Sequence, residues 1–294
     1  MFFLVLGNLA AQSEFSLIQY NTDSSGYSTG ILNELQYNSS AITNEFTKTF
    51  INGAYLTSEM KNSSYQRMNE FSRLGVDLNY GVHFSGSLNK IGKRNPYHLN
   101  YFLGVYNREH ADLSFQKNLF SLIFYGNKQY AGQTVETTGF NFNLLRYQQI
   151  QLGLFYNNGL GKTLALGVSL LNGEQNISYS VPYFDFYTSQ TGNELKLSWE
   201  LDARQTSALN TGFAVNNGWG FSTDLMYRFS YNSNSFSNNY FQFEVNDLGF
   251  INWNNQSLHL RSNDSVFFNG YEIKNVMEIH DSLIGNISTD TLLT

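Results

Sequence analysis

One stretch of the chain alternates strictly between apolar and polar side chains. Between Glu194 and Arg204, the odd positions carry leucine, tryptophan and alanine, and the even positions carry charged residues and one serine. A β-strand sends successive side chains to opposite faces, so this stretch predicts a strand with one apolar and one polar face. Its length matches the about 9–11 residues that a tilted strand needs to cross a bilayer. A soluble antiparallel sheet shows the same alternation, so the rest of the chain must decide between the two classes.

The same period of two recurs along most of the chain and predicts about ten strands, most of them longer than the usual 5–6 residues. Asn158 and Gly159 form a tight-turn dipeptide, and a slip in phase at Asp247 predicts a β-bulge. Residues 211–218 fit either a strand or a loop. The apolar faces of the clearest further strands lie at Leu74–Phe84, Tyr97–Val105, Ile150–Tyr156, Leu164–Leu170, Ile177–Tyr183, Trp219–Phe229 and Phe241–Val245.

The composition of the polar faces favours a membrane protein over a soluble one. Charged residues make up only 14% of the chain and aromatic residues 16%, whereas a globular surface is usually rich in lysine and glutamate. The polar faces mix glycine, serine and asparagine with a few charges of both signs, as in the interior of a barrel. We therefore expect an all-β fold, an antiparallel transmembrane β-barrel. A soluble β-sandwich or a lipocalin-like barrel is the alternative.

Hydropathy, charge and cysteine content exclude several other classes. No apolar run reaches the about 18 residues of a transmembrane helix. The net charge of −6, without a basic cluster, argues against nucleic acid as a partner, and the absence of cysteine excludes disulfides and thiolate metal sites. We expect no enzyme activity, no catalytic residue, no metal site and no cofactor, because the histidines are scattered without the spacing of metal ligands. They are His83, His98, His110, His259 and His280.

The first residues of the chain are typical of a secretory signal. Met1–Gln12 is rich in phenylalanine, leucine and alanine, and a cleavage site is predicted near Ala11. The basic residues that usually begin a signal are missing, so an apolar first strand is the alternative. We expect residues 1–11 to be a partial signal peptide and residues 12–294 to form a single barrel domain.

The period changes from two to about 3.6 between residues 112 and 125. Asp112 can cap the start of a helix there and Gly126 can end it. This pattern predicts one short amphipathic helix, the only substantial helix of the chain, packed on an end of the barrel as a connection. A plug or gate is the alternative. Upstream, Phe46–Tyr55 is predicted as a strand and Met60–Phe71 as a polar loop or the solvated end of a hairpin.

Charged residues on the polar faces would point into the lumen of a barrel. Glu200 and Asp202 share a face with Lys196 and Arg204, which predicts a solvated ladder of ion pairs rather than an acid–base pair. The lumen-facing candidates are Arg73, Asp77, Glu194, Lys196, Glu200, Asp202, Arg204, Asp224 and Arg228.

The chain also resembles a known family in several motifs. Shorter motifs stand at Phe124–Asn127, Gly132–Thr134 and Phe268–Gly270. The most specific motif is Asp247, Leu248, Gly249, Phe250, Ile251, any residue and Trp253. With these motifs the chain is similar to an uncharacterised family of Bacteroidota outer-membrane proteins, a domain of unknown function. The resemblance implies a barrel broadly similar to long-chain fatty-acid transporters, located in the bacterial outer membrane and surrounded by its lipid.

The same resemblance implies that the chain is a fragment. Members of the family run on for further strands, whereas this chain stops at Thr294 without the terminal aromatic residue typical of outer-membrane barrels. Bilayer hydrocarbon cannot satisfy the backbone groups of an open sheet edge. We therefore expect an incomplete barrel with one unpaired edge.

Two functions fit these expectations. The first is a channel or transporter for a small-molecule or hydrophobic solute, in which the lumen charges tune passage. The alternative is a structural or assembly barrel that anchors a periplasmic or surface protein partner. A continuous open lumen would favour transport. A lumen packed shut, together with an exposed patch on Asn254–Val276, would favour the partner role.

Overall fold

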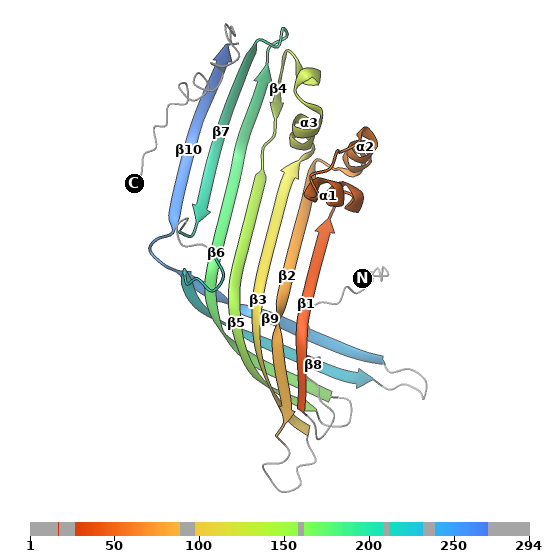
Figure 1. Cartoon of the computed structure of the whole chain (residues 1–294), viewed down its shortest axis with the longest axis vertical. Helices are drawn as coiled ribbons and strands as arrows, with labels where there is room; N and C mark the ends of the chain where they lie inside the picture. Colours follow the sequence, from red (N-terminus) through yellow and green to blue (C-terminus); the bar gives the residue numbers. More distant parts are fainter. Residues whose placement is uncertain are drawn as a thin grey trace, which may run out of the picture.

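The computed structural model describes Leu17 and residues 27–88, 98–157, 162–207, 212–231 and 239–269, and most of these residues form one antiparallel sheet (Figure 1). The predicted signal peptide and the chain beyond residue 269 lie outside the described residues. The elements are β1 (Tyr27–Ser39), α1 (Asn44–Ile51), α2 (Ser58–Arg67), β2 (Phe71–Ser87), β3 (His98–Gln116), α3 (Lys117–Tyr125), the 3-10 helix η2 (Lys128–Tyr130), β4 (Gln133–Glu136), β5 (Phe140–Asn157), β6 (Lys162–Thr188), β7 (Glu194–Gln205), β8 (Gly218–Tyr231), β9 (Asn239–Trp253) and β10 (Leu258–Asn269).

Strand β6 divides the sheet into two halves. Strands β1, β2, β3, β5 and β6 lie side by side along their length. Residues 162–173 of β6 then pair with β8, and residues 177–188 pair with β7. Strand β9 continues from β8, and β10 continues from β7. We call the part that contains β8 and β9 the lower half and the part that contains β7 and β10 the upper half. Figure 1 shows β8 and β9 running at an angle to β7 and β10.

A bulge at Glu174 separates the halves. Gly173 pairs with Tyr147 and Gln175 pairs with Arg146, so Glu174 is an extra residue in β6. An extra residue bends a strand, increases its local twist and shifts the alternation of its side chains by one. The bend lets one long strand change its partner from β8 to β7. The shift by one residue keeps the apolar side chains of β6 on the same face of the sheet on both sides of the bulge.

The register assigns every strand residue to one of two faces. Val82, Val105 and Ile150 pair in register across β2, β3 and β5, and all three are about half exposed. We call their side of the sheet the outer face. On the opposite, inner face of the lower half, Phe102 and Phe155 have no exposed surface. These two rings belong to a buried cluster of Leu17, Phe102, Tyr106, Phe155, Ala165 and Met226.

The three α-helices pack on the outer face of the upper half. Thr43 caps α1 by accepting a hydrogen bond from the Phe46 backbone N–H (3.2 Å), and Thr57 caps α2 in the same way. Strand β3 leads directly into α3, which ends at Gly126 with a positive φ of 82°. Their shared core contains Ala41, Phe46, Met68, Phe115 and Phe120.

The antiparallel all-β prediction is confirmed at the level of the sheet. The described residues contain ten strands. Among them, no ladder of backbone hydrogen bonds joins β1 to β9 or β10. The alternation at Leu164–Leu170 continues at Ile177–Tyr183 after a change of phase near Asn172, and both stretches belong to the single strand β6. Residues 212–217 form a loop rather than a strand.

The helix predictions require correction. The predicted helix over residues 112–125 begins only at Lys117, because Asp112 to Gln116 still pair in register with β2. It is also not the only helix, since α1 replaces most of the predicted strand Phe46–Tyr55 and α2 most of the predicted loop Met60–Phe71. The two threonine caps start helices in this region, where the apolar residues do not settle a period. None of the described helices is long and apolar enough to span a bilayer.

Candidate functional site

The outer face of the lower half is a belt of exposed apolar side chains. The belt runs from β1 through β6 to β9, so it covers every strand of this half. A soluble monomer rarely exposes an apolar patch larger than about 300–600 Å². Leu170 and Leu248 are more than 60% exposed. The belt includes Ile31, Val82, Leu103, Val105, Ile150, Leu152, Leu154, Leu164, Leu166, Val168, Leu170, Trp219, Phe221, Tyr227, Phe241, Phe243, Leu248 and Phe250.

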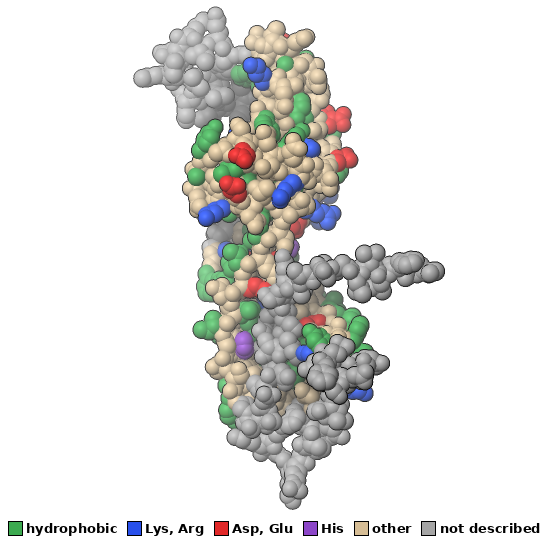
Figure 2. Space-filling model, turned by 90° about the vertical axis from the view of Figure 1, so that its right-hand side faces the viewer, with side chains coloured by type: hydrophobic (Ala, Val, Ile, Leu, Met, Phe, Trp, Pro, Cys, Tyr) green, Lys and Arg blue, Asp and Glu red, His purple; other side chains and the backbone are tan. Residues whose placement is uncertain are grey.

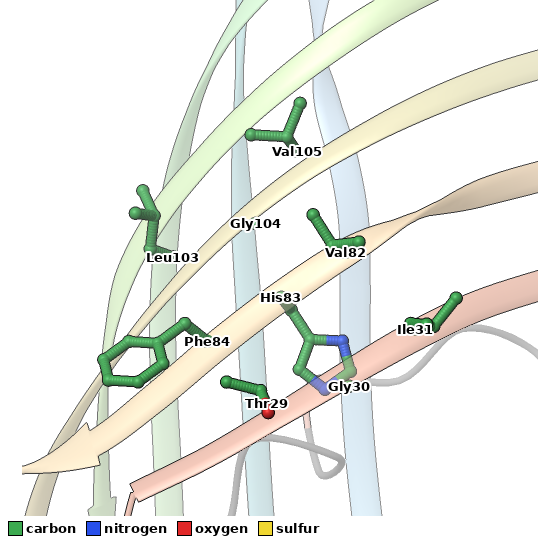
Figure 3. Close-up of a pocket in the computed structure, with 9 residues that line it drawn as sticks. All are labelled: Thr29, Gly30, Ile31, Val82, His83, Phe84, Leu103, Gly104 and Val105. Carbon is green, nitrogen blue, oxygen red and sulfur yellow. The ribbon is translucent and has the colours of Figure 1, made fainter.

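A shallow hollow of about 470 Å³ lies on this belt over β1, β2 and β3 (Figure 3). Ile31, Val82 and Leu103 point into it from the three strands. Gly30 and Gly104 add no side chain, and the His83 imidazole lies against Gly30, where it would contact any added Cβ. The hollow is therefore mostly apolar, with Thr29 and His83 as its polar side chains.

The interior of the lower half is filled by aromatic rings that lie over glycines. A Cβ at Gly153 would overlap the Phe102 ring and the Leu166 carbonyl oxygen. A Cβ at Gly104 would overlap the Tyr106 ring. The glycines thus provide the space that the rings occupy, and large and small side chains interdigitate as in a well-packed core.

Above this packed core lies a polar cluster around Asp247, which is itself partly buried, whereas most of the groups bonded to it are buried. The Gln149 side-chain amide donates to Asp247 Oδ1 at 2.5 Å and to Ser169 Oγ at 3.0 Å. Arg108 Nε donates to the side-chain Oε1 of Gln149 at 3.2 Å, and the Tyr147 hydroxyl donates to Asp247 Oδ2 at 3.5 Å. Gln149 has no exposed surface. Buried polar groups need such partners to offset their lost hydration.

Asp224 extends the cluster on the neighbouring strand β8. Its Oδ2 accepts a hydrogen bond from the Gln151 amide at 3.0 Å, and its Oδ1 accepts one from the Asp247 backbone N–H at 2.8 Å. Asp224 is 2% exposed. The two carboxylates are therefore tied together through the backbone of β9, and the cluster joins β3, β5, β6, β8 and β9.

A β-bulge aims Asp247 into this cluster. The register between β8 and β9 shifts at Thr223, and Asp247 adopts a positive φ of 55°, a conformation that aspartate tolerates better than most residues. A Cβ at Gly249 would overlap the Phe221 carbonyl oxygen. Trp253 packs where a Cβ at Gly173 would lie. The predicted bulge is present, and the segment Asp247–Trp253 docks β9 closely onto β8 and β6.

A cavity of about 240 Å³ adjoins the cluster on the side of the upper half. It is smaller than the about 300–1,000 Å³ of typical small-molecule sites. Among the described residues, no three histidine or carboxylate side chains are arranged to hold a metal ion. Its lining residues are Glu34, Gln36, Asp77, Asn79, Arg108, Asn246 and Asp247.

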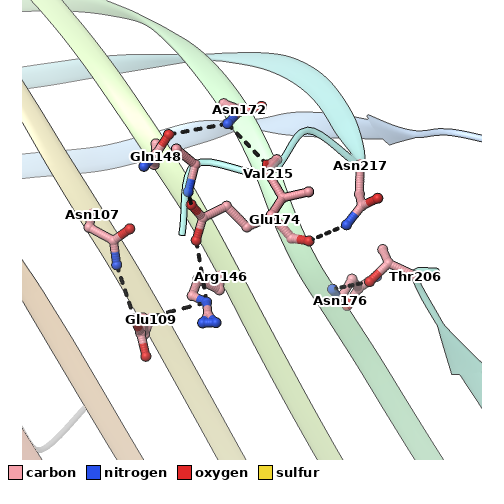
Figure 4. Close-up of polar contacts among 11 residues, drawn as sticks. Asn107, Glu109, Arg146, Gln148, Asn172, Glu174, Asn176, Thr206, Val215 and Asn217 are labelled. Carbon is pink, nitrogen blue, oxygen red and sulfur yellow. Dashed lines mark hydrogen bonds and ion pairs between the residues drawn. The ribbon is translucent and has the colours of Figure 1, made fainter. Parts of the chain in front are cut away.

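A second polar network lies on the outer face, at the upper margin of the apolar belt (Figure 4). The Arg146 guanidinium lies 3.3 Å from a carboxylate oxygen of Glu174, the bulge residue of β6. The Glu174 carboxylate accepts a hydrogen bond from the Ala214 backbone N–H at 2.5 Å. The Glu174 backbone carbonyl oxygen accepts one from the side-chain amide of Asn217 at 2.6 Å. The loop 212–217 is thereby held over the strands, and this network marks where the belt ends.

The predicted lumen residues fall into two separate groups. Asp224 lies in the polar cluster around Asp247, and Arg228, also on β8, stacks its guanidinium 3.6 Å from the centre of the Tyr240 ring. The candidates on β2 and β7 share the inner face of the upper half by register. They are Arg73, Asp77, Glu194, Lys196, Glu200, Asp202 and Arg204.

The predicted ion-pair ladder on β7 is replaced in large part by cross-strand pairs. Asp202 contacts Arg204 at 3.3 Å on its own strand, but it also contacts His259 and Arg261 of β10, each at 3.0 Å. Asp77 Oδ1 lies 2.5 Å from Nδ1 of His110 on β3. Antiparallel pairing places these charges side by side, which the spacing within one strand does not reveal.

Sequence reasoning missed most of the residues of the polar cluster around Asp247. Arg108, Tyr147, Gln149 and Gln151 belong to it in addition to the two aspartates. One sequence signal was available, because two glutamines alternate with the apolar residues that form the belt on β5.

Comparison with known proteins identifies the family but no characterised relative. A family model, described as a family of unknown function (DUF5723), matches residues 15–292. No curated protein and no solved structure matches the chain. Because the match covers nearly the whole chain, this protein belongs to the DUF5723 family.

Proposed function

We propose that this protein is an outer-membrane β-barrel whose lower half is embedded in the bilayer. The exposed apolar belt is the observation that carries this proposal. The belt covers the outer face of all seven strands of the lower half. It ends at the Arg146–Glu174 network, where polar side chains replace the apolar ones. Antiparallel strands with apolar residues outside and polar or small residues inside are the pattern of outer-membrane barrels.

The interior favours an anchor over an open channel. Phe102 and Phe155 are fully buried at its centre, and the Asp247 cluster lies directly above them. A water-filled pore would leave polar side chains solvated along its length, whereas these are bonded to one another. We therefore assign the protein the role of a structural or assembly barrel, with a partner rather than a solute as its ligand.

The upper half supplies the surface for that partner. Its inner face carries charges of both signs, and a cleft of about 790 Å³ lies on it near Asp202 and Arg261. Arg204 and Arg261 are more than 60% exposed, although both contact Asp202. Exposed guanidinium groups suit hydrogen bonding to carboxylate or phosphate groups of a partner. The partner is a periplasmic or surface protein in this proposal.

Reconstitution of the full chain in lipid vesicles tests the proposal. We expect the lower half to be protected from protease after folding into the vesicles, and we expect no ionic conductance above that of protein-free vesicles. Protease cleavage throughout the lower half would contradict membrane insertion. Steady conductance from inserted protein would contradict the anchor role and would favour a channel.

A further inference from the structure

An apolar groove of about 430 Å³ lies between the helices and the outer face of the upper half. Helix α1 contributes Phe46 and Phe50 to its wall, and α3 contributes Ile123 and Phe124. The strands contribute Val76 and other apolar residues of the outer face. Phe50 and Ile123 are each about 60% exposed, so the rim is apolar as well. This volume is within the about 300–1,000 Å³ range of small-molecule sites.

The wall of the groove offers no hydrogen bond and no charge to a ligand. Tyr37 and Thr47 carry the hydroxyl groups of the lining, and these two bond to each other at 2.6 Å. None of the described residues that line the groove is charged. A peptide would bury its backbone N–H and C=O groups there without partners, at a cost of several kcal/mol (about 2–7 for each group). The wall therefore suits a hydrocarbon chain and not a peptide segment.

An apolar stripe connects the groove to the belt along β1 and β2. Tyr37 pairs with Val76 at the groove, and Leu35 pairs with Leu78 below it. Ile31 pairs with Val82, which belongs to the belt, and Ile31 is 84% exposed. The stripe spans residues 76–82 of β2, about 20 Å at about 3.3 Å per residue, comparable to the about 15 Å of one leaflet of acyl chains. Asn33 is the polar residue along this path.

On these grounds we propose that the groove holds an acyl chain of a bilayer phospholipid, which reaches it along the β1–β2 stripe. We take a bilayer phospholipid as the source of the chain, because the stripe leads from the groove to the belt. The inference rests on the proposed function, since the stripe leads to lipid only if the belt lies in the bilayer. Acidic and basic side chains lie together on the face of the molecule that carries α1 and α2 (Figure 2), as a zwitterionic headgroup would require.

Fluorescence quenching by labelled lipid tests this proposal in the full chain. The chain has no cysteine, so a single cysteine can carry a bimane label at any chosen position. The label is placed at Ile123 in the groove, at Leu152 in the belt or at Glu59 on the exposed surface of α2. The protein is folded into dioleoylphosphatidylcholine vesicles with or without doxyl-labelled phosphatidylcholine. We expect quenching at Ile123 to be within about twofold of that at Leu152, and we expect none at Glu59.

Filling the groove provides the matched variant. Val76→Phe places a larger side chain in the groove, and Val82→Phe makes the same change on the same face of β2 in the belt. We expect Val76→Phe to remove most of the quenching at Ile123 and Val82→Phe to leave it unchanged. Leu113→Phe fills the groove from β3 and replaces Val76→Phe if circular dichroism shows that the first variant does not fold.

The outcomes separate the two proposals. Quenching at Leu152 without quenching at Ile123 overturns the groove proposal and leaves the membrane barrel intact. Absence of quenching at Leu152 overturns the membrane barrel, and the groove proposal with it. Quenching at Ile123 that persists in both groove-filling variants indicates contact with the membrane surface and overturns the groove. Quenching by doxyl-stearic acid but not by doxyl-phosphatidylcholine overturns the phospholipid source.

Discussion

The two halves of the sheet show the same alternation of apolar and polar side chains, but they differ in what covers the inner face. In the lower half, the inner face is filled, so that Phe102 and the polar Gln149 are both completely buried. In the upper half, the inner face is open. Phe267 of β10 lies on it by register and is 57% exposed, and Asp202 is surrounded by exposed basic side chains. A period of two therefore defines a face without defining what covers that face.

The difference between the halves has two local causes. Glycines on the inner face of the lower half, such as Gly104 and Gly153, let the strands curl around large aromatic rings. Bulges at Glu174 and Asp247 bend β6 and β9 where the halves meet. In the upper half, Gly75 has only one atom near the place of its Cβ, the Ala111 carbonyl oxygen at 3.9 Å. Gly104 and Gly153 of the lower half are thus packed closely against rings, whereas Gly75 of the upper half is not.

Removing a ring from the filled interior is the most direct way to test this difference. We expect Phe102→Ala to lower the free energy of unfolding by about 3–5 kcal/mol, because it leaves a cavity in a packed core. Phe267→Ala removes the same ring from the open inner face, and we expect a change of no more than about 0.5 kcal/mol. Urea unfolding of the full chain in phospholipid vesicles measures both. Equal losses would show that the upper half is filled too.

The outer faces of the two halves differ in the medium that we propose for them. We expect Leu152→Arg in the belt to cost about 2–4 kcal/mol, as for a cation near the centre of a bilayer. The sequence alone predicts the same for Leu197→Arg, since Leu195–Ala203 is also an apolar face. With the belt as the bilayer segment, we expect Leu197→Arg to cost under about 1 kcal/mol. Vesicle unfolding titrations compare the two, and equal costs would extend the bilayer segment to the upper half.

The sequence was sufficient for the sheet because alternation is a local property of a strand. The strand at Glu194–Arg204 appears as β7, and the bulge at Asp247 lies where the phase slips. The helices were harder to predict. Thr43 and Thr57 cap α1 and α2 through hydrogen bonds three residues along the chain, in a region whose apolar residues do not settle a period.

The candidate site was less predictable because it depends on contacts between distant strands. Gln149 and Asp247 are 98 residues apart in sequence, and their contact requires the curl of the lower half. The same holds for Asp202, whose main partners come from β10 rather than from its own strand. The alternating glutamines of β5 are the one signal that the sequence offers, and only the register of β5, β6, β8 and β9 brings them to the two aspartates.

Replacing a glycine by alanine compares the packing of the inner faces of the two halves. A Cβ at Gly153 would overlap the Leu166 carbonyl oxygen, so the backbone must shift. We expect Gly153→Ala to lower the free energy of unfolding by about 1–3 kcal/mol, the usual cost of overpacking. Gly75→Ala makes the same change in the upper half, where we expect no loss. A shift in the urea midpoint for Gly75→Ala as large as that for Gly153→Ala would contradict a difference in packing.

Exchanging a carboxylate for an amide compares the polar groups of the two halves. Asparagine tolerates the positive φ of Asp247, so Asp247→Asn leaves the backbone unstrained and tests the charge and the hydrogen bonds of the carboxylate. The new amide brings N–H donors toward Gln149 and Tyr147, which donate to Asp247 in the native cluster. We expect a loss of about 1–2 kcal/mol, because one buried donor is left without an acceptor.

The matched change in the upper half is Asp202→Asn. Its partners Arg204, His259 and Arg261 are exposed, and water replaces the lost ion pairs, so we expect no measurable change in stability. Added salt should reduce any remaining difference between wild type and Asp202→Asn, since exposed pairs are screened. It should leave the loss in Asp247→Asn unchanged, because Gln149 and Asp224, which bond to Asp247, are buried. Parallel urea titrations at low and high salt distinguish the two, and a salt-dependent loss at Asp247 would place its cluster in contact with water.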